Sequence, residues 1–515
     1  MSASQEKKRR REQRAEGVEK KQVQKTKTLM AKKRAKKIKT AAICAVAFIL
    51  IILVVFNSSL FYTGLTAVHI GDWKYTTAEF NYFYQSAFLT TFNQYYQSLG
   101  EYAYYLLDPN KSFSKQDYNE EQTYEDYFTD QAFDRMKKIA MLNRAAVEDK
   151  FVLDEDGQAQ IDMTISNAKA MANQGGLSFS SFLVQTYGKG MTESIFNKLI
   201  NWEIIAANYT NTMLDNMVFT DEELDARYEE SSADYNLITF HRYFVNATAK
   251  PEEGLDDAAA KAAAYTAANE IAVGRTEDVF AELVYQHVPE DQKEAYADPT
   301  ATLQKNVSPS SINADYKEWL TSPERTYGET TVIETETGFH VLLFVGSNDN
   351  NYYLQNFRHI LIKAEATGQA TAESEAPELT AADIKTAQMK AEEVFAQWED
   401  DPTEDYFIQL ANEESDDAGS NTIGGLYENK KLGDLVPEIE DWLFDETRKV
   451  GDTDIIYVKS ANYTGYHIMY YVGAGERCDR TIAKGILQTE RFETWVADRD
   501  SDYKLSTTMA FWFAK

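Results

Sequence analysis

The chain has 515 residues, 43% of them hydrophobic and 26% charged, which is too long for a single compact core. Its two cysteines exclude a disulfide framework or a cysteine-based metal site within one chain. The six histidines are scattered without metal-ligand spacing, and no phosphate-binding loop or dinucleotide fingerprint occurs. We therefore expect neither a cofactor nor a metal.

The N-terminal end differs in charge from the rest of the chain. Residues 1–40 carry 16 Lys or Arg and 4 Glu, a net charge of +12, whereas the remainder holds 36 basic and 78 acidic residues, a net charge of −42. Residues 41–56 read AAICAVAFILIILVVF, and the apolar stretch extends to residue 61, about the 20 residues that a bilayer span needs. This pattern predicts a cytoplasmic tail at 1–40, a single transmembrane helix at 41–61 and an extracytoplasmic remainder.

Two other interpretations of this end are weaker. A cleaved signal peptide would have a shorter basic region and a small residue three positions before the cleavage site, which residues 65–67 lack. A basic tail can bind nucleic acid, but next to a membrane span it indicates topology and contact with anionic lipid. We therefore predict a retained membrane anchor and no nucleic-acid partner.

Residues 68–234 are predicted to form a helical module. Apolar residues recur at helical spacing over 76–96, 124–150 and 192–217, and Thr220 with the acidic residues after it predicts a helix start. Three segments resemble the helical chaperone module of SurA/PrsA-type foldases. They are VHIGD at 68–72, LSFSSF at 177–182 and TDEEL at 220–224.

The next two parts of the chain repeat one another. Five correspondences occur in the same order, at offsets that drift from 117 to 127 residues. The matched segments are 240–245 with 357–362, 277–280 with 404–407, 318–320 with 441–443, Gly328 with Gly451, and 337–341 with 464–468. This order predicts two copies of one small α+β domain with an antiparallel sheet, at 235–349 and 350–476.

The second copy carries a recognisable set of motifs. His359 lies in FRHILI and His467 in TGYHIM, and both segments have the pattern of buried strands. Between them come SDDAGS at 415–420 and then Gly424 and Gly425. A lone histidine on a strand is usually a satisfied core residue, but this ordered set resembles a parvulin-type peptidyl-prolyl isomerase. The resemblance covers residues 235–476.

The resemblance implies a polar centre and an apolar slot for proline. His359, His467 and Thr464 would form the hydrogen-bonded centre, and Asp417 takes the position where parvulins have Cys or Asp. The implied slot wall, which could equally be ordinary core, consists of Leu435, Ile439 and Phe444. After Gly424 and Gly425 the family continues Asp-Leu-Gly, whereas this chain has Leu-Tyr-Glu at 426–428. This departure puts the loop geometry and the catalytic strength in doubt.

The first copy departs further from the family. Arg242 stands where His359 stands, and the neighbouring His241 would point to the opposite face of its strand. The Gly-Gly and Ser-x-Asp motifs are absent, and only Thr337 and His340 remain of the implied centre. We interpret this copy as non-catalytic.

Residues 477–515 are predicted to return to the helical module, with an amphipathic stretch at 481–496. The sequence as a whole predicts an α+β multidomain chain, and it leaves two functions possible. The first is a membrane-anchored, extracytoplasmic prolyl isomerase and chaperone for unfolded or exported polypeptides with X-Pro bonds. The second is a holdase in which both parvulin-like copies have lost catalysis.

Overall fold

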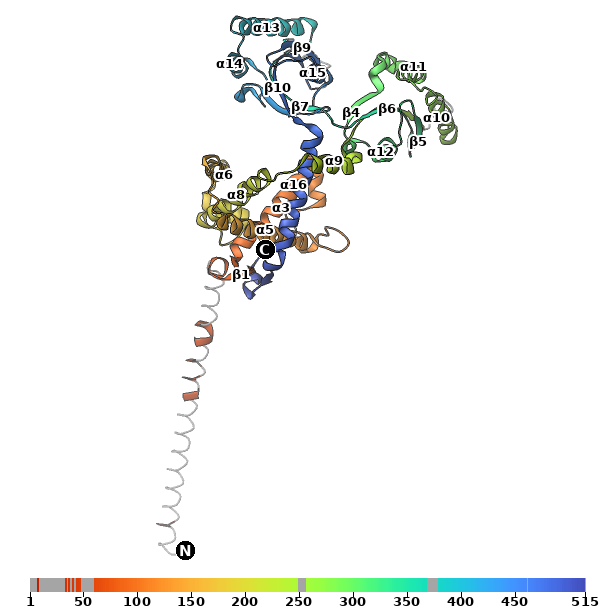
Figure 1. The fold of residues 1–515 in the computed structure, drawn as a ribbon. Helices are drawn as coiled ribbons and strands as arrows, with labels where there is room; N and C mark the ends of the chain where they lie inside the picture. Colours follow the sequence, from red (N-terminus) through yellow and green to blue (C-terminus); the bar gives the residue numbers. More distant parts are fainter. Residues whose placement is uncertain are drawn as a thin grey trace. The chain divides into compact units, whose positions relative to one another are not determined.

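The molecule is described by a computed structural model that divides into two compact units (Figure 1). The described residues are 7–8, 33–34, 36–37, 39–40, 43–47, 60–248, 256–367, 378–460 and 462–514. The predicted anchor at 41–61 lies mostly outside them, and among them no helix combines the length and apolar character needed to cross a bilayer. Unit 1 contains residues 1–217 and 491–515, and unit 2 contains residues 218–490.

Unit 1 is mainly helical and contains a three-stranded antiparallel sheet of order β11-β1-β2. Its core is rich in aromatic side chains, and Tyr75, Phe80, Phe83 and Phe128 are fully buried. The elements are α2 (Leu60–Thr63), β1 (Thr66–Ile70), β2 (Trp73–Thr76), α3 (Thr77–Leu99), α4 (Ala103–Leu106), α5 (Tyr124–Glu148), α6 (Glu155–Gln174), α7 (Phe179–Tyr187), α8 (Glu193–Asp215) and β11 (Leu505–Thr507).

Threonine caps fix where the long helices begin. Thr76 and Thr123 each accept a hydrogen bond from the backbone N–H three residues on, and the acidic residue at that position bonds back to the cap. The same capping box starts helix α9 (Asp221–Tyr235) of unit 2, where the cap is Thr220. The helix start that the sequence predicts at Thr220 is therefore confirmed, since both orphan backbone donors find acceptors.

Unit 2 contains two four-stranded antiparallel sheets with the same strand order, which are β4-β3-β6-β5 and β8-β7-β10-β9. The first copy consists of β3 (Leu237–Asn246), α10 (Asp257–Ile271), α11 (Glu277–His287), β4 (Leu303–Val307), α12 (Ala314–Leu320), β5 (Thr330–Glu334) and β6 (Gly338–Asn348). The second consists of β7 (Tyr353–Lys363), α13 (Ala381–Asp400), α14 (Glu404–Glu414), β8 (Leu426–Lys430), α15 (Pro437–Leu443), β9 (Thr453–Lys459) and β10 (Thr464–Arg477). The two sheets thus have the same strand order and the same pairing, as two copies of one domain would have.

Each sheet of unit 2 separates two hydrophobic clusters. In the second copy, Ile360 and Ile468 face helices α13 and α14, whereas Phe357 and Met469 face helix α15. This division follows from strand geometry, because successive side chains point to opposite faces. His359 and His467 have odd numbers and therefore lie on the α15 face.

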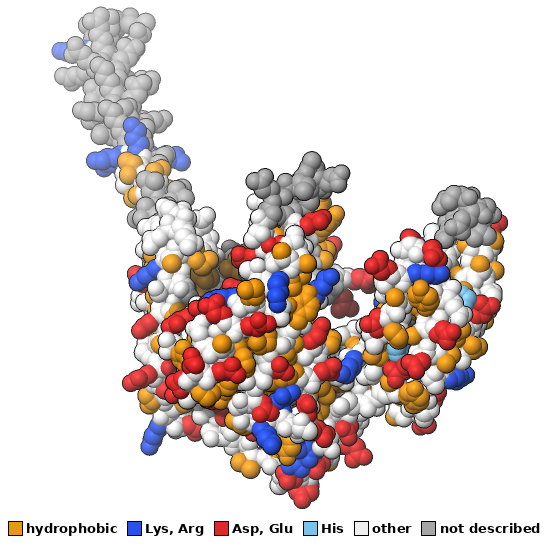
Figure 2. All heavy atoms as spheres, turned by 90° about the horizontal axis from the view of Figure 1, so that it is seen from above, with side chains coloured by type: hydrophobic (Ala, Val, Ile, Leu, Met, Phe, Trp, Pro, Cys, Tyr) orange, Lys and Arg blue, Asp and Glu red, His pale blue; other side chains and the backbone are white. Residues whose placement is uncertain are grey.

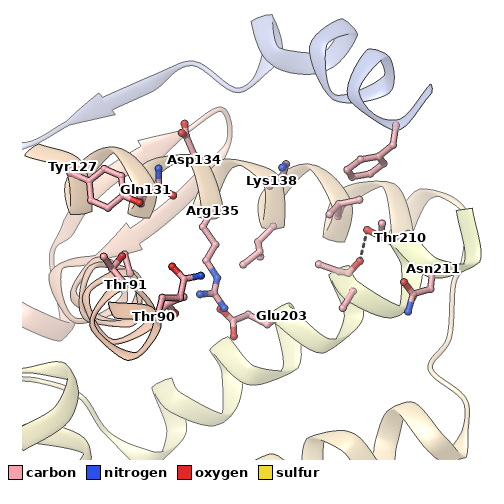
Figure 3. A pocket seen from close by; sticks show the side chains of 17 residues that line it. Thr90, Thr91, Tyr127, Gln131, Asp134, Arg135, Lys138, Glu203, Thr210 and Asn211 are labelled. Carbon is pink, nitrogen blue, oxygen red and sulfur yellow. Dashed lines mark hydrogen bonds and ion pairs between the residues drawn. The ribbon is translucent and has the colours of Figure 1, made fainter. Parts of the chain in front are cut away.

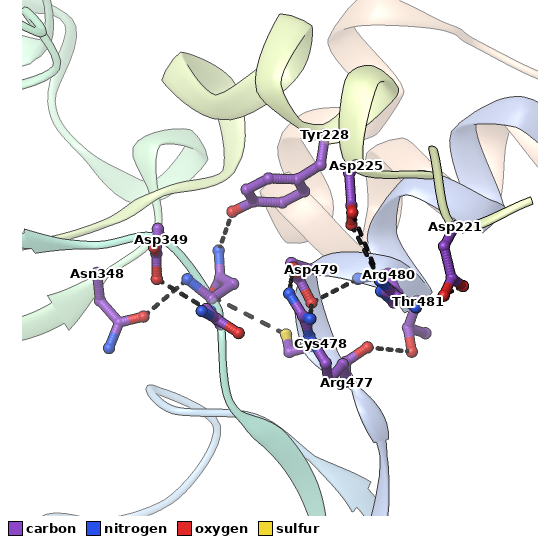
Figure 4. Close-up of polar contacts among 12 residues, drawn as sticks. Asp221, Asp225, Tyr228, Asn348, Asp349, Arg477, Cys478, Asp479, Arg480 and Thr481 are labelled. Carbon is purple, nitrogen blue, oxygen red and sulfur yellow. Dashed lines mark hydrogen bonds and ion pairs between the residues drawn. The ribbon is translucent and has the colours of Figure 1, made fainter. Parts of the chain in front are cut away.

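Helix α9, the connection between the two copies and helix α16 (Cys478–Arg499) meet in a polar cluster within unit 2 (Figure 4). Asn350 is 2% exposed, and its side-chain amide donates to Tyr228 Oη at 2.7 Å and to the Tyr235 carbonyl at 2.8 Å. The backbone carbonyl of Asn350 accepts a hydrogen bond from the Asp479 backbone N–H at 3.0 Å. Arg480 pairs with Asp221 and with Asp225 of α9. One buried asparagine thus connects three segments that are far apart in the sequence.

Acidic side chains outnumber basic ones on the face of the described residues that Figure 2 displays. This agrees with the net charge of −30 for the whole chain. Residues 364–380, which follow β7, contain four Glu and no Lys or Arg. Most of this acidic segment lies outside the described residues, which stop at residue 367 and resume at 378.

Candidate active site

Two central strands bring the two histidines together. In the β7–β10 register, His359 lies opposite Met469 and His467 lies opposite Leu361, so both histidine side chains project from the same face. The rings are stacked, and their Nδ1 atoms lie 2.8 Å apart. His359 is 6% exposed and His467 is 2% exposed. A slip of one residue in either strand would separate them.

The loop after α14 brings Asp417 to His359. Ser415 Oγ accepts a hydrogen bond from the Leu361 N–H at 3.1 Å, and the Asp416 N–H donates to the Leu361 carbonyl at 2.8 Å. These bonds hold the loop along the edge of β7 beyond the end of its pairing with β8. Asp417 Oδ2 then lies 2.9 Å from His359 Nε2.

Two consecutive glycines make the turn into β8 possible. Gly424 and Gly425 have φ of +68° and +69°, a region that strongly favours glycine. A Cβ on Gly425 would lie 2.2 Å from the carbonyl oxygen of His359. Gly425 also accepts from the His359 N–H at 3.0 Å. The Leu-Tyr-Glu departure leaves this turn intact, because the strained positions at its start are still glycines.

Three hydroxyl groups that the sequence did not single out extend the network. Tyr463 Oη lies 2.9 Å from His467 Nε2, and Tyr427 Oη donates to Asp417 Oδ2 at 2.9 Å. Ser420 Oγ donates to the same carboxylate oxygen. Tyr427 belongs to the segment that departs from the family, and it supports Asp417 directly. The available signal was the period of two along β8, which places Tyr427 and Gly425 on one face.

With both imidazoles neutral, one proton arrangement satisfies every bond of this network. The Asp417 carboxylate only accepts, so His359 Nε2 carries the proton and His359 Nδ1 accepts from His467 Nδ1–H. His467 Nε2 is then an acceptor, and Tyr463 O–H donates to it. The four groups form a single directed chain that ends at the carboxylate.

Two groups of this network have strongly shifted pKa values. The hydrogen bond from His359, with those from Ser420 and Tyr427, holds the pKa of Asp417 well below its usual range. Burial, and then the neighbouring His359, lowers the pKa of His467 to about 3. Asp417 is therefore ionised and His467 neutral at pH 7.

The predicted slot residues lie on the same side of the sheet as the histidines. Ile439 is buried at 5% exposure, and Leu435 and Phe444 are half-buried against the same cluster. Ile439 thus serves as core as well as lining this face. The Phe444 ring packs edge-on against Tyr352, with centroids 5.5 Å apart.

Thr464 does not join the polar centre. It begins strand β10 at an even-numbered position, and its carbonyl accepts from the Ala364 N–H at 2.8 Å. Within the part of the chain that the structure describes, its hydroxyl makes no hydrogen bond. Tyr463 contacts His467 instead, because the residue before the strand can turn toward the histidine face whereas the alternation directs Thr464 away.

Tyr427→Phe is expected to lower isomerase activity about three- to tenfold while the fold is retained. The change removes one of the donors that orient the Asp417 carboxylate, a loss of about 0.5–1.5 kcal/mol. Steady-state kcat/KM measures the effect. The matched control is Tyr457→Phe, which changes a half-exposed tyrosine on β9. An equal loss of activity in this control would show that the Tyr427 hydroxyl has no specific role in the active site.

Unit 1 contains a separate cavity of about 650 Å³ among helices α3, α5 and α8 and the start of the C-terminal segment (Figure 3). Arg135 and Glu203 form an ion pair of 2.7 Å on its wall, and Glu203 also accepts from Tyr82 Oη at 2.9 Å. Burial raises the pKa of Glu203. Ile139, Leu142 and Ala206 supply apolar lining, so the cavity has both apolar and charged walls.

Comparison with known proteins identifies the domain around the histidines. Residues 359–473 match the family described as Rotamase: PPIC-type PPIASE domain. This range starts at His359 and includes Asp417 and His467. No curated protein sequence matches the chain significantly.

Solved structures similar to this chain include two PrsA peptidylprolyl isomerases and a SurA-like chaperone. PrsA of Bacillus anthracis is 15% identical, with 46% of this chain and 93% of that chain covered and a TM-score of 0.18. PrsA of Bacillus cereus is 16% identical, with 61% and 84% covered and a TM-score of 0.18. A chain from the study of PEB4 and Cj1289, SurA-like chaperones of Campylobacter jejuni, is 15% identical, with 39% and 71% covered and a TM-score of 0.16. The family match establishes that the chain carries a peptidyl-prolyl isomerase domain of the PPIC type at residues 359–473.

Proposed function

We propose that this chain is a membrane-anchored, extracytoplasmic peptidyl-prolyl cis/trans isomerase and chaperone that assists the folding of exported polypeptides. The observation that carries the enzymatic part is the hydrogen-bonded chain from Tyr463 through His467 and His359 to Asp417. The anchor and the extracytoplasmic location rest on the charge asymmetry and the apolar segment of the sequence.

The reaction requires no bond to a nucleophile and no redox step. Rotation about the peptide C–N bond faces a barrier of about 18–20 kcal/mol, and X-Pro bonds exchange over tens to hundreds of seconds without help. In the twisted transition state the amide loses resonance, its oxygen becomes less negative and its nitrogen becomes a better acceptor. A catalyst therefore only has to bind the twisted amide more tightly than the planar one.

The site offers the two features that such binding needs. The half-buried Leu435 and Phe444 provide an apolar surface for the pyrrolidine ring, and the buried Ile439 packs beneath them. The anionic Asp417 disfavours the planar amide, whose oxygen carries more negative charge, when the carbonyl lies near it. The histidine pair and Tyr463 hold that carboxylate and its neighbours in one arrangement, so little reorganisation accompanies rotation.

A protease-coupled prolyl isomerisation assay on the full chain tests this proposal. We expect catalysis that rises in proportion to the concentration of the chain. The burial of Ile439, which leaves little of its side chain for a substrate, favours the holdase as the alternative. Suppressed aggregation of an unfolded client without any isomerisation would decide for the holdase.

The membrane topology has its own test. External protease applied to intact cells is expected to degrade the chain beyond about residue 61, because the basic tail should hold the N-terminus in the cytoplasm. Immunoblots with antibodies against each end measure the result. Full protection of the C-terminal part, or a mature protein that lacks residues 1–40, would contradict the proposed topology.

A further inference from the structure

The first copy has different side chains at the positions that form the active site in the second copy. In the β3–β6 register Arg242 lies opposite Leu342 and Phe244 lies opposite His340, just as His359 and Leu361 lie opposite Met469 and His467. Arg242 therefore takes the place of His359, and His340 takes the place of His467. The two copies share a frame but differ in the chemistry of this face.

Helix α12 changes the apolar slot as well. Tyr316 is the third residue of α12, as Ile439 is the third residue of α15, and both helices have seven residues. Tyr316 is 5% exposed, and its ring lies 5.0 Å from the ring of His340. Tyr316 thus occupies the position that Ile439 has in the second copy, and its hydroxyl lies next to Arg242.

The polar groups of this face are poorly satisfied within the chain. In the second copy both nitrogens of both histidines have partners. In the first copy His340 is 8% exposed, and its Nδ1 is buried without a hydrogen-bond partner among the described residues. Arg242 is exposed, and its one hydrogen bond within that part of the chain is a long contact of 3.4 Å with Tyr316 Oη.

We propose that this face of the first copy, formed by Arg242, Tyr316 and His340, binds a carboxylate of a polypeptide. Guanidinium presents only donors, and its planar fork matches a carboxylate in a bidentate geometry. The Tyr316 hydroxyl lies beside it and can donate as well. The site is separate from the isomerase centre and does not depend on catalysis there.

The surrounding charges favour a carboxylate over a phosphate dianion. Arg242 and Asp315 both act electrostatically on His340, so a negative side chain already lies near this face. The net charge of −42 beyond residue 40 adds long-range repulsion, which grows with ligand charge. A monoanion meets half the repulsion of a dianion. Two sources share this chemistry, namely an acidic side chain and the C-terminus of a chain.

The test uses the purified full chain and fluorescence anisotropy with three labelled, proline-free peptides at about 0.15 M salt, where long-range repulsion is screened beyond about 8 Å. One peptide has a single Glu and an amidated end. The second has Gln with a free C-terminal carboxylate, and the third has Gln with an amidated end. We expect at least one carboxylate peptide to bind about tenfold more tightly than the neutral peptide.

Variants then locate the site. Arg242→Gln is expected to abolish the preference, and Arg242→Lys to retain only part of it, because ammonium cannot form the bidentate pair. Lys317→Gln removes an equal charge from α12 outside the three-residue face and is expected to keep the preference. An unchanged circular dichroism spectrum and thermal unfolding curve verify that Arg242→Gln is folded.

Three outcomes would overturn the proposal. They are equal binding of all three peptides by the unmodified chain, a preserved preference in Arg242→Gln, and an equal loss of preference in Lys317→Gln. A preference for the Glu peptide alone identifies acidic side chains as the ligand, and a preference for the free C-terminus alone identifies chain ends.

Discussion

His467→Ala is expected to lower kcat/KM for prolyl isomerisation about 10- to 100-fold. The side chain is 2% exposed and makes two hydrogen bonds, to His359 Nδ1 and to Tyr463 Oη. Its removal leaves both partners unpaired at a buried site, at about 1–3 kcal/mol for each group. Because these bonds hold the catalytic network in position, their loss weakens transition-state binding and lowers the rate. The protease-coupled assay measures it, and circular dichroism verifies that the chain is folded.

His340→Ala is the matched control in the first copy. His340 occupies the equivalent strand position and is similarly buried at 8% exposure, so its loss makes a comparable cavity. Because Arg242 stands where His359 would be, we expect turnover to remain nearly unchanged. The reverse pattern, in which His340→Ala abolishes turnover and His467→Ala does not, would assign catalysis to the first copy.

Gly425→Ala is expected to destabilise the second copy by at least about 3 kcal/mol. A positive φ of +69° costs a residue with a side chain about 1–2 kcal/mol. The added Cβ would also lie 2.2 Å from the His359 carbonyl oxygen, so the backbone that holds His359 must move. The active site should therefore unfold at a lower urea concentration than in the unmodified chain. The urea concentration at which isomerase activity is half lost measures the effect.

Gly451→Ala separates the two contributions in the same copy. Gly451 has φ of +90°, but the nearest atom to its added Cβ is Tyr470 Oη at 3.9 Å. We expect a smaller loss of stability that reflects conformation alone, and little change in activity. An equal loss of stability in the two variants would show that the backbone around His359 accommodates the added Cβ without a further loss of free energy.

The sequence was most informative where strand geometry decides the outcome. His359, His467 and Asp417 could be assigned together because their motifs occur in the order that resembles the parvulin family, and the β7–β10 register places both histidines on one face of the sheet. The repeat was likewise readable, since its five pairs of segments fall on equivalent strands, helices and turns of the two copies. Apolar periodicity predicted the long helices α3, α5 and α8 to within a few residues.

Contacts made by loops and strand ends were not predictable in this way. Tyr463 comes just before β10, so no periodic pattern shows where its hydroxyl points. The period of two gives the face of Tyr427 in β8, but its contact with Asp417 depends on the two-glycine turn that sets the position of this strand. The resemblance to parvulins implied a place for Thr464 in the polar centre, whereas the alternation of strand β10 directs its side chain away from the histidine face. From the sequence, the Leu-Tyr-Glu segment was expected to disturb the active-site loop. Its Tyr427 instead donates a hydrogen bond to Asp417, a tertiary contact that the sequence does not reveal.

The pairing of β11 with β1 affects the order in which the chain can fold. Unit 1 is built from both ends of the chain, and residues 218–490 are inserted between its two parts. Within that insert α9 and α16 are joined by ion pairs, including Arg227 with Glu490. A folded insert therefore brings its own two ends together and spares unit 1 the entropy of closing a long flexible loop. The helical core can be completed only once the last residues have been synthesised, whereas the isomerase domain requires none of them.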